Sequence, residues 1–215
     1  WATFAYFPIA GWVFNFKVED GSVVDGGFLV FNVGLMDFAG GTVVEVASGA
    51  AALAVALVVG RRFGFAKGMH APHNVPLTLI GAAILWFGWF GFNAGSQLAA
   101  DGTAALAFVN TLVAPVGALI SWSLLERFTV GKPTAVGAAS GAVAGLVAIT
   151  PSCAYLNPVW ALVLGLIVGV VCALAVELKW KLGFDDSLDV VGIHLVGGIV
   201  GTLFIGIAGE KVGWL

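Results

Sequence analysis

The feature that most restricts the fold is a series of seven apolar stretches that are almost free of charge. An α-helix needs about 20 predominantly apolar residues to cross a bilayer, and it satisfies its own backbone hydrogen bonds in hydrocarbon. Only 10% of the residues are charged and the mean hydropathy is +1.04, whereas soluble domains carry about 25% charged residues. We therefore expect an all-α polytopic membrane protein, with helices near residues 1–16 (truncated), 39–60, 75–98, 104–126, 134–150, 158–180 and 188–208. The segment 17–36 is predicted to be a polar loop.

Seven consecutive spans decide which connecting segments share a side of the membrane. The segments 61–74, 127–133 and 179–187 fall on one side of the membrane. The connecting segments on the opposite side contain only two basic residues, Lys17 and Lys211. The first group contains Arg61, Arg62, Lys67, Arg127, Lys132, Lys179 and Lys181. By the positive-inside rule this group is expected to be cytoplasmic. The opposite face is acidic, which should raise the local concentration of cations.

Two of the apolar stretches each place one ionisable residue at membrane depth. The chain carries no further charge between Glu45 and Gly60, and His194 is the only histidine at membrane depth. A charged side chain at the bilayer centre costs about 2.5–3.5 kcal/mol on insertion scales, so such residues face a bundle interior or a pore. Both residues are therefore candidates for a functional site, and a pair of them would titrate as one coupled unit.

The acids that begin these two helices place Glu45 and His194 near the same depth. Glu45 lies eight residues after Asp37, which is about 12 Å along a helix. His194 lies five residues after Asp189, which is about 7–8 Å. Because the two helices run in opposite directions, both residues fall toward the middle of a roughly 30 Å core. This arrangement predicts an inverted repeat with a site at the midplane.

An aromatic stretch at residues 84–96 has two interpretations. Its rings include Trp86, Trp89, Phe90 and Phe92, and a polar residue, Ser96, follows them. The stretch can be an aromatic belt at headgroup level. Alternatively, it forms a vestibule in which ring faces and a hydroxyl group stabilise a small cation.

Several long motifs resemble the ammonium transporter (Amt/MEP/Rh) family, and they are most similar to its bacterial Amt branch. They lie at residues 37–44, 72–76, 88–96, 107–111, 140–147, 149–151 and 189–194. The resemblance implies a fold of eleven helices, built as a five-plus-five inverted-repeat bundle and assembled as a homotrimer. About seven of those helices, from the end of the fourth to the tenth, would be present. Residues 1–215 would then form a single transmembrane ammonium transporter domain that is truncated at both ends.

The same resemblance implies an outer site that recruits ammonium. Ser96 would accept a hydrogen bond from the cation, and Trp89 would line the region. Phe14 matches a position where many members carry a vestibule tryptophan, with Trp12 close by as a second candidate. Asp37 would be the acid near this site. We expect it mainly to bond backbone amides at the start of its helix, with electrostatic recruitment as the second possibility.

The resemblance also implies a gate and a pore. Phe92 would be one ring of a stacked phenylalanine gate, and Glu45 and His194 would be the mid-pore pair. The usual family pair is two histidines, so Glu45 is a departure, although some fungal members also carry an acid there. Gly11 is a second departure, because the family commonly has histidine at that position.

The function implied is transmembrane ammonium transport. Ammonium would be recruited at the vestibule and deprotonated, and ammonia would then pass the pair with a linked proton; methylammonium is a further candidate substrate. An ammonium sensor with the same vestibule is the alternative. An intramembrane enzyme is disfavoured because the sequence has neither an H-E-x-x-H motif nor a nucleophile elbow.

The expected partners follow from this assignment. They are membrane lipid, two further copies of the chain in a homotrimer, and a PII-type signalling protein on the cytoplasmic face. The expected location is the inner (plasma) membrane of the cell. We expect no cofactor, metal or nucleic acid, and we interpret Cys153 and Cys172 as small packing residues.

Overall fold

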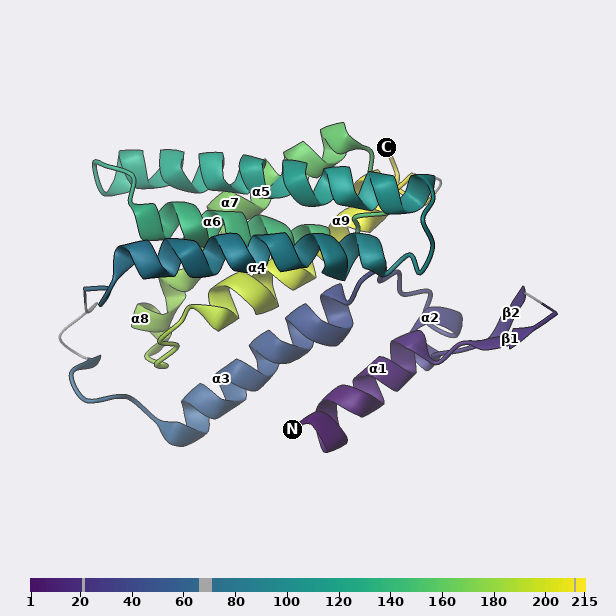
Figure 1. Ribbon diagram of the computed structural model, residues 1–215. Helices are drawn as coiled ribbons and strands as arrows, with labels where there is room; N and C mark the ends of the chain where they lie inside the picture. The colour runs from purple at the N-terminus through teal and green to yellow at the C-terminus, as the bar shows by residue number, and fades with distance from the viewer. Residues whose placement is uncertain (21, 66–70, 211) are drawn as a thin grey trace.

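In the described part of the chain, seven helical segments lie at the apolar stretches, in the expected order (Figure 1). The computed structural model describes residues 1–20, 22–65, 71–210 and 212–215, so Lys67 and Lys211 lie outside the described residues. The segments are η1 Ala2–Tyr6 with α1 Phe7–Phe14, η2 Gly41–Val46 with α3 Ala47–Val59, α4 Val75–Gly95, α5 Gly102–Thr129, α6 Ala135–Ile149, α7 Pro158–Val176 with α8 Leu178–Leu182, and η4 Val191–Leu195 with α9 Val196–Ala208.

Five of these segments are long and apolar enough to cross a bilayer. They are Gly41–Val59, Val75–Gly95, Gly102–Thr129, Pro158–Leu182 and Val191–Ala208. The other two, Ala2–Phe14 and Ala135–Ile149, are apolar but shorter. The predicted multi-pass helical membrane fold is therefore confirmed.

The prediction of a loop over residues 17–36 is wrong in detail. Strands β1 (Lys17–Glu19) and β2 (Ser22–Asp25) form an antiparallel hairpin, and α2 (Phe28–Phe31) follows it. The polar residues of this segment predict a loop. Val18 nevertheless pairs with Val23, and β-branched residues favour strands. Gly27 then brings the chain back against α1, since a Cβ there would lie 2.3 Å from the carbonyl oxygen of Trp12.

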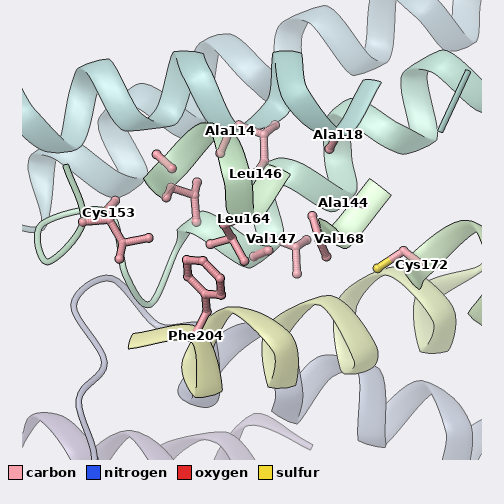
Figure 2. Close-up of a cluster of buried hydrophobic side chains, with 14 of the residues drawn as sticks. Ala114, Ala118, Ala144, Leu146, Val147, Cys153, Leu164, Val168, Cys172 and Phe204 are labelled. Carbon is pink, nitrogen blue, oxygen red and sulfur yellow. The ribbon is translucent and has the colours of Figure 1, made fainter. Parts of the chain in front are cut away.

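The bundle is built around α6, whose residues are mostly buried. Helices α4, α5, α7 and α9 all pack against it. Small side chains let these backbones approach closely. Figure 2 shows Ala114 and Ala118 of α5 beside Ala144, Leu146 and Val147 of α6.

Glycines make these close contacts. Glycines four residues apart favour close approach of helices, and this spacing recurs at 91/95 on α4, 137/141/145 on α6 and 165/169 on α7. A Cβ on Gly145 would lie 2.5 Å from Cα of Pro115, and one on Gly165 would lie 2.1 Å from the carbonyl oxygen of Ala114. The expectation fails for Gly91 and Gly95 of α4, where an added Cβ meets nothing within 4 Å among the described residues. Spacing alone cannot show which face of a helix meets a neighbour.

Many large apolar side chains lie on the outside of the bundle. On α4, Ile80, Ile84 and Phe87 are each more than half exposed. A water-soluble domain rarely exposes a continuous apolar surface of this kind. Small residues inside and large apolar residues outside are the arrangement expected for helices surrounded by lipid.

The grouping of basic connections agrees with the structure where they are described. Arg61 donates from Nε to the carbonyl oxygen of Gly183 at 2.7 Å, and Arg62 Nε lies 3.3 Å from a carboxylate oxygen of Asp185. The connection between α5 and α6 lies at the same end of the bundle (Figure 1). Lys179, counted as a connecting-segment charge, is instead buried and paired with Asp189.

We predict that Gly165→Ala destabilises the bundle because its Cβ would overlap the carbonyl oxygen of Ala114. Overpacking of this kind costs about 1–3 kcal/mol. The matched control is Gly81→Ala on α4, where a Cβ meets nothing within 4 Å. Thermal unfolding of the detergent-solubilised full-length protein measures both, and equal melting temperatures for the two variants would contradict the packing described here.

Candidate functional site

The structure brings Glu45 and His194 into direct contact. Nδ1 of His194 lies 2.6 Å from Oε2 of Glu45, although 149 positions separate the two residues in the sequence. The Glu45 side chain is 2% exposed and that of His194 is 25% exposed. A carboxylate this deeply buried needs a hydrogen-bonding partner to offset its desolvation, and the imidazole is that partner.

Each member of the pair lies in its own short π-helical segment. Glu45 belongs to the π-helical segment η2 and His194 to the π-helical segment η4, and each segment continues as a regular α-helix. Such π-helical turns are rare, and they occur frequently at functional sites. Each is preceded by a residue in the left-handed region, Gly40 at φ 114° and Asp189 at φ 60°.

Asp37 holds the start of η2 through both of its carboxylate oxygens. Oδ1 accepts from the N–H groups of Gly40 at 2.8 Å and Gly41 at 2.6 Å. Oδ2 accepts from those of Thr42 at 2.7 Å and Val43 at 3.3 Å. A helix start leaves such N–H groups without intrahelical partners. The carboxylate is therefore bonded to backbone amides in the way the sequence analysis expected.

Asp186, and not Asp189, occupies the equivalent position before η4. Its carboxylate accepts from the N–H groups of Val190 at 3.1 Å and Val191 at 2.7 Å. Asp186 precedes His194 by eight residues, the same spacing that separates Asp37 from Glu45. The sequence comparison of Asp37 with Asp189 was therefore wrong by three positions.

Asp189 has a different role, at the left-handed turn that leads into η4. Its carboxylate pairs with the buried ammonium of Lys179, which also donates to the carbonyl oxygen of Asp186 at 3.1 Å. Among non-glycine residues, aspartate is one of those that tolerate a positive φ. The ion pair thus fixes the left-handed turn before η4. Gly40 makes the corresponding turn before η2 without a side chain.

Burial raises the pKa of the Asp37 carboxyl, and the four backbone N–H groups bonded to it act in the opposite direction. Burial likewise raises the pKa of Asp189, while the hydrogen bond and charge of Lys179 act to lower it. Exposed Asp101, which caps α5, has a lowered pKa because the N–H of Ala104 and the Gln97 amide stabilise its charge. All three groups lie outside the membrane-spanning segments.

The aromatic stretch on α4 is partly internal. Trp89 is 6% exposed, and its indole N–H donates to Oγ1 of Thr150 at 2.9 Å. Its ring meets Phe92 edge to face at a centroid distance of 5.6 Å. A Cβ on Gly40 would lie 3.8 Å from the tip of the Phe92 ring. Phe92 therefore lies beside the start of the segment that carries Glu45.

Ser96 is oriented as an acceptor. Its hydroxyl donates to the carbonyl oxygen of Phe92 at 2.7 Å, in the same helix. A serine hydroxyl has one proton and two lone pairs, so with the proton used the lone pairs remain. A partly buried oxygen of this kind suits a ligand that only donates hydrogen bonds.

Phe14 and Trp12 lie apart from the other predicted site residues. Both side chains are exposed on α1, which lies at the edge of the molecule beside α3 in Figure 1. Among the described residues, no hydrogen bond or ring contact joins them to Phe92 or Ser96. The chain therefore brings together six of the eight predicted residues around η2, η4 and the end of α4.

The sequence analysis missed a buried polar seam beside Trp89. Asn93 is fully buried and donates to Oγ1 of Thr111 at 3.0 Å, and its Oδ1 has no hydrogen-bond partner among the residues that the structure describes. Asn110 donates to the carbonyl oxygens of Cys153 at 2.8 Å and Leu156 at 2.6 Å. An asparagine within each of two apolar spans was the available signal, since polar side chains at membrane depth need partners.

Fold and site together define a multi-pass membrane protein with an acid–imidazole pair buried between two crossing helices. No three His, Cys, Asp or Glu side chains lie close enough to hold a metal ion in the part of the chain that the structure describes. A carboxylate and an imidazole in direct contact can share a hydrogen bond and exchange its proton.

Comparison with known proteins identifies the family. A profile described as "Ammonium Transporter Family" matches residues 1–213, and the chain belongs to this family. An ammonium transporter of Mycobacterium bovis is 56% identical over 208 residues, which are 96% of this chain and 43% of that protein. These relatives are named as transporters and not as enzymes.

Two solved structures share the fold. Mep2 of Saccharomyces cerevisiae matches with a TM-score of 0.88 and 39% identity, over 98% of this chain and 45% of that one. A protein described as a Sensor Amt Protein matches with a TM-score of 0.80 and 36% identity, over 87% of this chain and 47% of that one. The chain thus spans about half the length of the relatives it matches.

We predict that Asp37→Ala destabilises the full-length protein because four backbone N–H groups lose their acceptor. Loss of a capping residue costs about 0.5–2 kcal/mol. Asp37→Asn keeps one oxygen and is expected to have an intermediate melting temperature. If Asp37→Ala melts like the wild type, the carboxylate does not hold the start of η2.

Proposed function

We propose that the full-length protein transports ammonium across the membrane, with Glu45 and His194 as a proton relay. The observation that carries this proposal is the 2.6 Å contact between Nδ1 of His194 and Oε2 of Glu45 within two apolar segments. An apolar pore removes the hydration of an ammonium ion and so strongly disfavours the charged form. Neutral ammonia can pass, provided that the proton has a separate acceptor.

The ring orientation supports the relay. When Glu45 is ionised, the proton of a neutral imidazole is on Nδ1, where it is donated to the carboxylate, and Nε2 keeps a free lone pair. A proton that reaches Nε2 then allows the Nδ1 proton to move to Glu45, so that the pair takes up one proton without a separated charge. Since His194 is 25% exposed and Glu45 is 2% exposed, the imidazole is the member that a permeating molecule meets.

The outer site would work in the order in which its groups lie. Ser96 accepts a hydrogen bond from ammonium, and Phe92 acts as one ring of the gate. Trp89 holds Phe92 through their edge-to-face contact. Phe14, with Trp12 near it, would contribute rings to the vestibule, and Asp37 holds the helix start with electrostatic recruitment as a secondary effect.

Several wider properties belong to the same proposal. Methylammonium is a candidate substrate, the assembly is a homotrimer, and the segments 61–74, 127–133 and 179–187 face the cytoplasm from the inner membrane. A PII-type protein would dock on that face. The basic residues of these segments support the orientation.

An ammonium sensor is the second candidate, and the similarity to a Sensor Amt Protein favours it. The two functions differ in whether ammonium crosses the membrane. In proteoliposomes a transporter produces an ammonium-evoked current, whereas a sensor binds ammonium at the same vestibule without current.

We predict that Glu45→Gln and His194→Ala each lower the ammonium-evoked current of the full-length protein by about 100-fold or more, since positioned proton transfer contributes at least that factor. Glu19→Gln, which changes an exposed carboxylate on the hairpin, is the matched control and should leave the current unchanged. Unchanged current and ion selectivity in both pair variants would contradict the relay.

We predict that Ser96→Ala raises the ammonium concentration for half-maximal current by about tenfold, because a hydrogen bond to a charged group contributes about 1.5–3 kcal/mol. Thr129→Val is the control, because the Thr129 hydroxyl also donates to a carbonyl four residues earlier, at 2.9 Å. An equal shift in both variants, or none in Ser96→Ala, would exclude Ser96 from recruitment.

A further inference from the structure

Two glycines lie where the helices that carry Glu45 and His194 cross. Gly49 follows Glu45 by four residues, and Gly198 follows His194 by four residues. Residues four apart lie on the same face of a helix, one turn from each other. Each glycine is therefore one turn beyond a member of the pair, and both glycines are buried.

Atoms of the opposite helix fill the space that a side chain on each of these glycines would need. A Cβ on Gly49 would lie 2.4 Å from the backbone nitrogen of Leu195 and 2.6 Å from its Cβ. A Cβ on Gly198 would lie 3.0 Å from Cβ of Glu45 and 3.1 Å from the carbonyl oxygen of Gly41. Alanine at Gly49 thus forces the helices apart, whereas alanine at Gly198 requires a shift of a few tenths of an ångström.

The two contacts are reciprocal. A Cβ on Gly49 would meet Leu195, the residue after His194. A Cβ on Gly198 would lie 3.0 Å from Cγ2 of Val46, the residue after Glu45. Each glycine thus touches the opposite helix directly beside the other pair residue. A change in the distance between the two helices at this crossing also changes the distance between Nδ1 of His194 and Oε2 of Glu45. Both side chains extend from the turns that cross here.

We infer that Gly49 and Gly198 are positioning residues that set the Glu45–His194 hydrogen bond. Other glycines of α9 do not share this geometry. Gly201 packs on α6, where a Cβ would lie 2.0 Å from the carbonyl oxygen of Ala148, and a Cβ on Gly206 meets nothing within 4 Å. Only the consequence for transport rests on the proposed function; the effect on the pair does not.

The test compares Gly49→Ala, Gly198→Ala, Gly201→Ala and Gly206→Ala in the full-length protein. The first readout is the ¹⁵N resonance of His194 Nδ1, assigned by its loss in His194→Ala, which reports the hydrogen bond to Glu45. The second is the pH profile of the ammonium-evoked current in proteoliposomes. The ¹⁵N resonance reports the hydrogen bond between His194 and Glu45 whether or not the protein transports ammonium.

We expect Gly198→Ala and Gly49→Ala to shift the His194 resonance and move the pH profile, with current reduced about three- to tenfold, because small misplacements at a reacting site are costly. Gly206→Ala should match the wild type in both readouts. Gly201→Ala should lower the melting temperature but keep the wild-type resonance. If Gly49→Ala does not fold, the milder Gly198→Ala decides the question.

The outcomes separate the two proposals. A shifted resonance with unchanged current supports the positioning role and contradicts the relay. A wild-type resonance in Gly198→Ala overturns the positioning role, whatever the current does. An equal shift in Gly201→Ala also overturns it, because general loosening of the bundle would then explain the effect.

Discussion

The rest of the structure depends on keeping one hydrogen bond intact, between His194 and the buried carboxylate of Glu45. A buried carboxylate whose partner is removed is strongly destabilising. The two residues come from segments far apart in the sequence, so the fold must hold two helices in one fixed relation. The carboxylates of Asp37 and Asp186 fix the starts of η2 and η4, and the crossing glycines fix their separation.

The surrounding bundle supports this arrangement through small residues. Gly197 and Gly201 turn one face of α9 toward α6, while Gly198 turns the adjacent face toward η2. Without a hydrophobic driving force between helices in lipid, such close packing supplies much of their association. The large side chains are then left for the lipid-facing surface, where they cost nothing to expose.

The parts of the site that follow from sequence are those with a strong energetic signature. Charge in an apolar span singled out Glu45 and His194, and an acid at a helix start predicted the bonding of Asp37. Contacts between distant segments could not be obtained in this way. Asp186 was overlooked because Asp189 lies closer to the apolar stretch, and the burial of Lys179 depends on the fold of residues 177–190.

The fold likewise has parts that follow from the sequence and parts that depend on tertiary contacts. Span number and order follow from hydropathy, whereas the 17–25 hairpin depends on pairing that polar residues conceal. Glycine spacing predicted the packing of Gly165 but could not distinguish it from that of Gly91. The face that a helix turns to its neighbours is a tertiary property.

Infrared difference spectroscopy of the full-length protein in lipid tests the central claim most directly. The carboxyl band of Glu45 is assigned by its loss in Glu45→Gln and is then followed in His194→Ala. If the two residues share one hydrogen bond, removal of the imidazole shifts the frequency of that band. A band that keeps its frequency in His194→Ala would contradict the account.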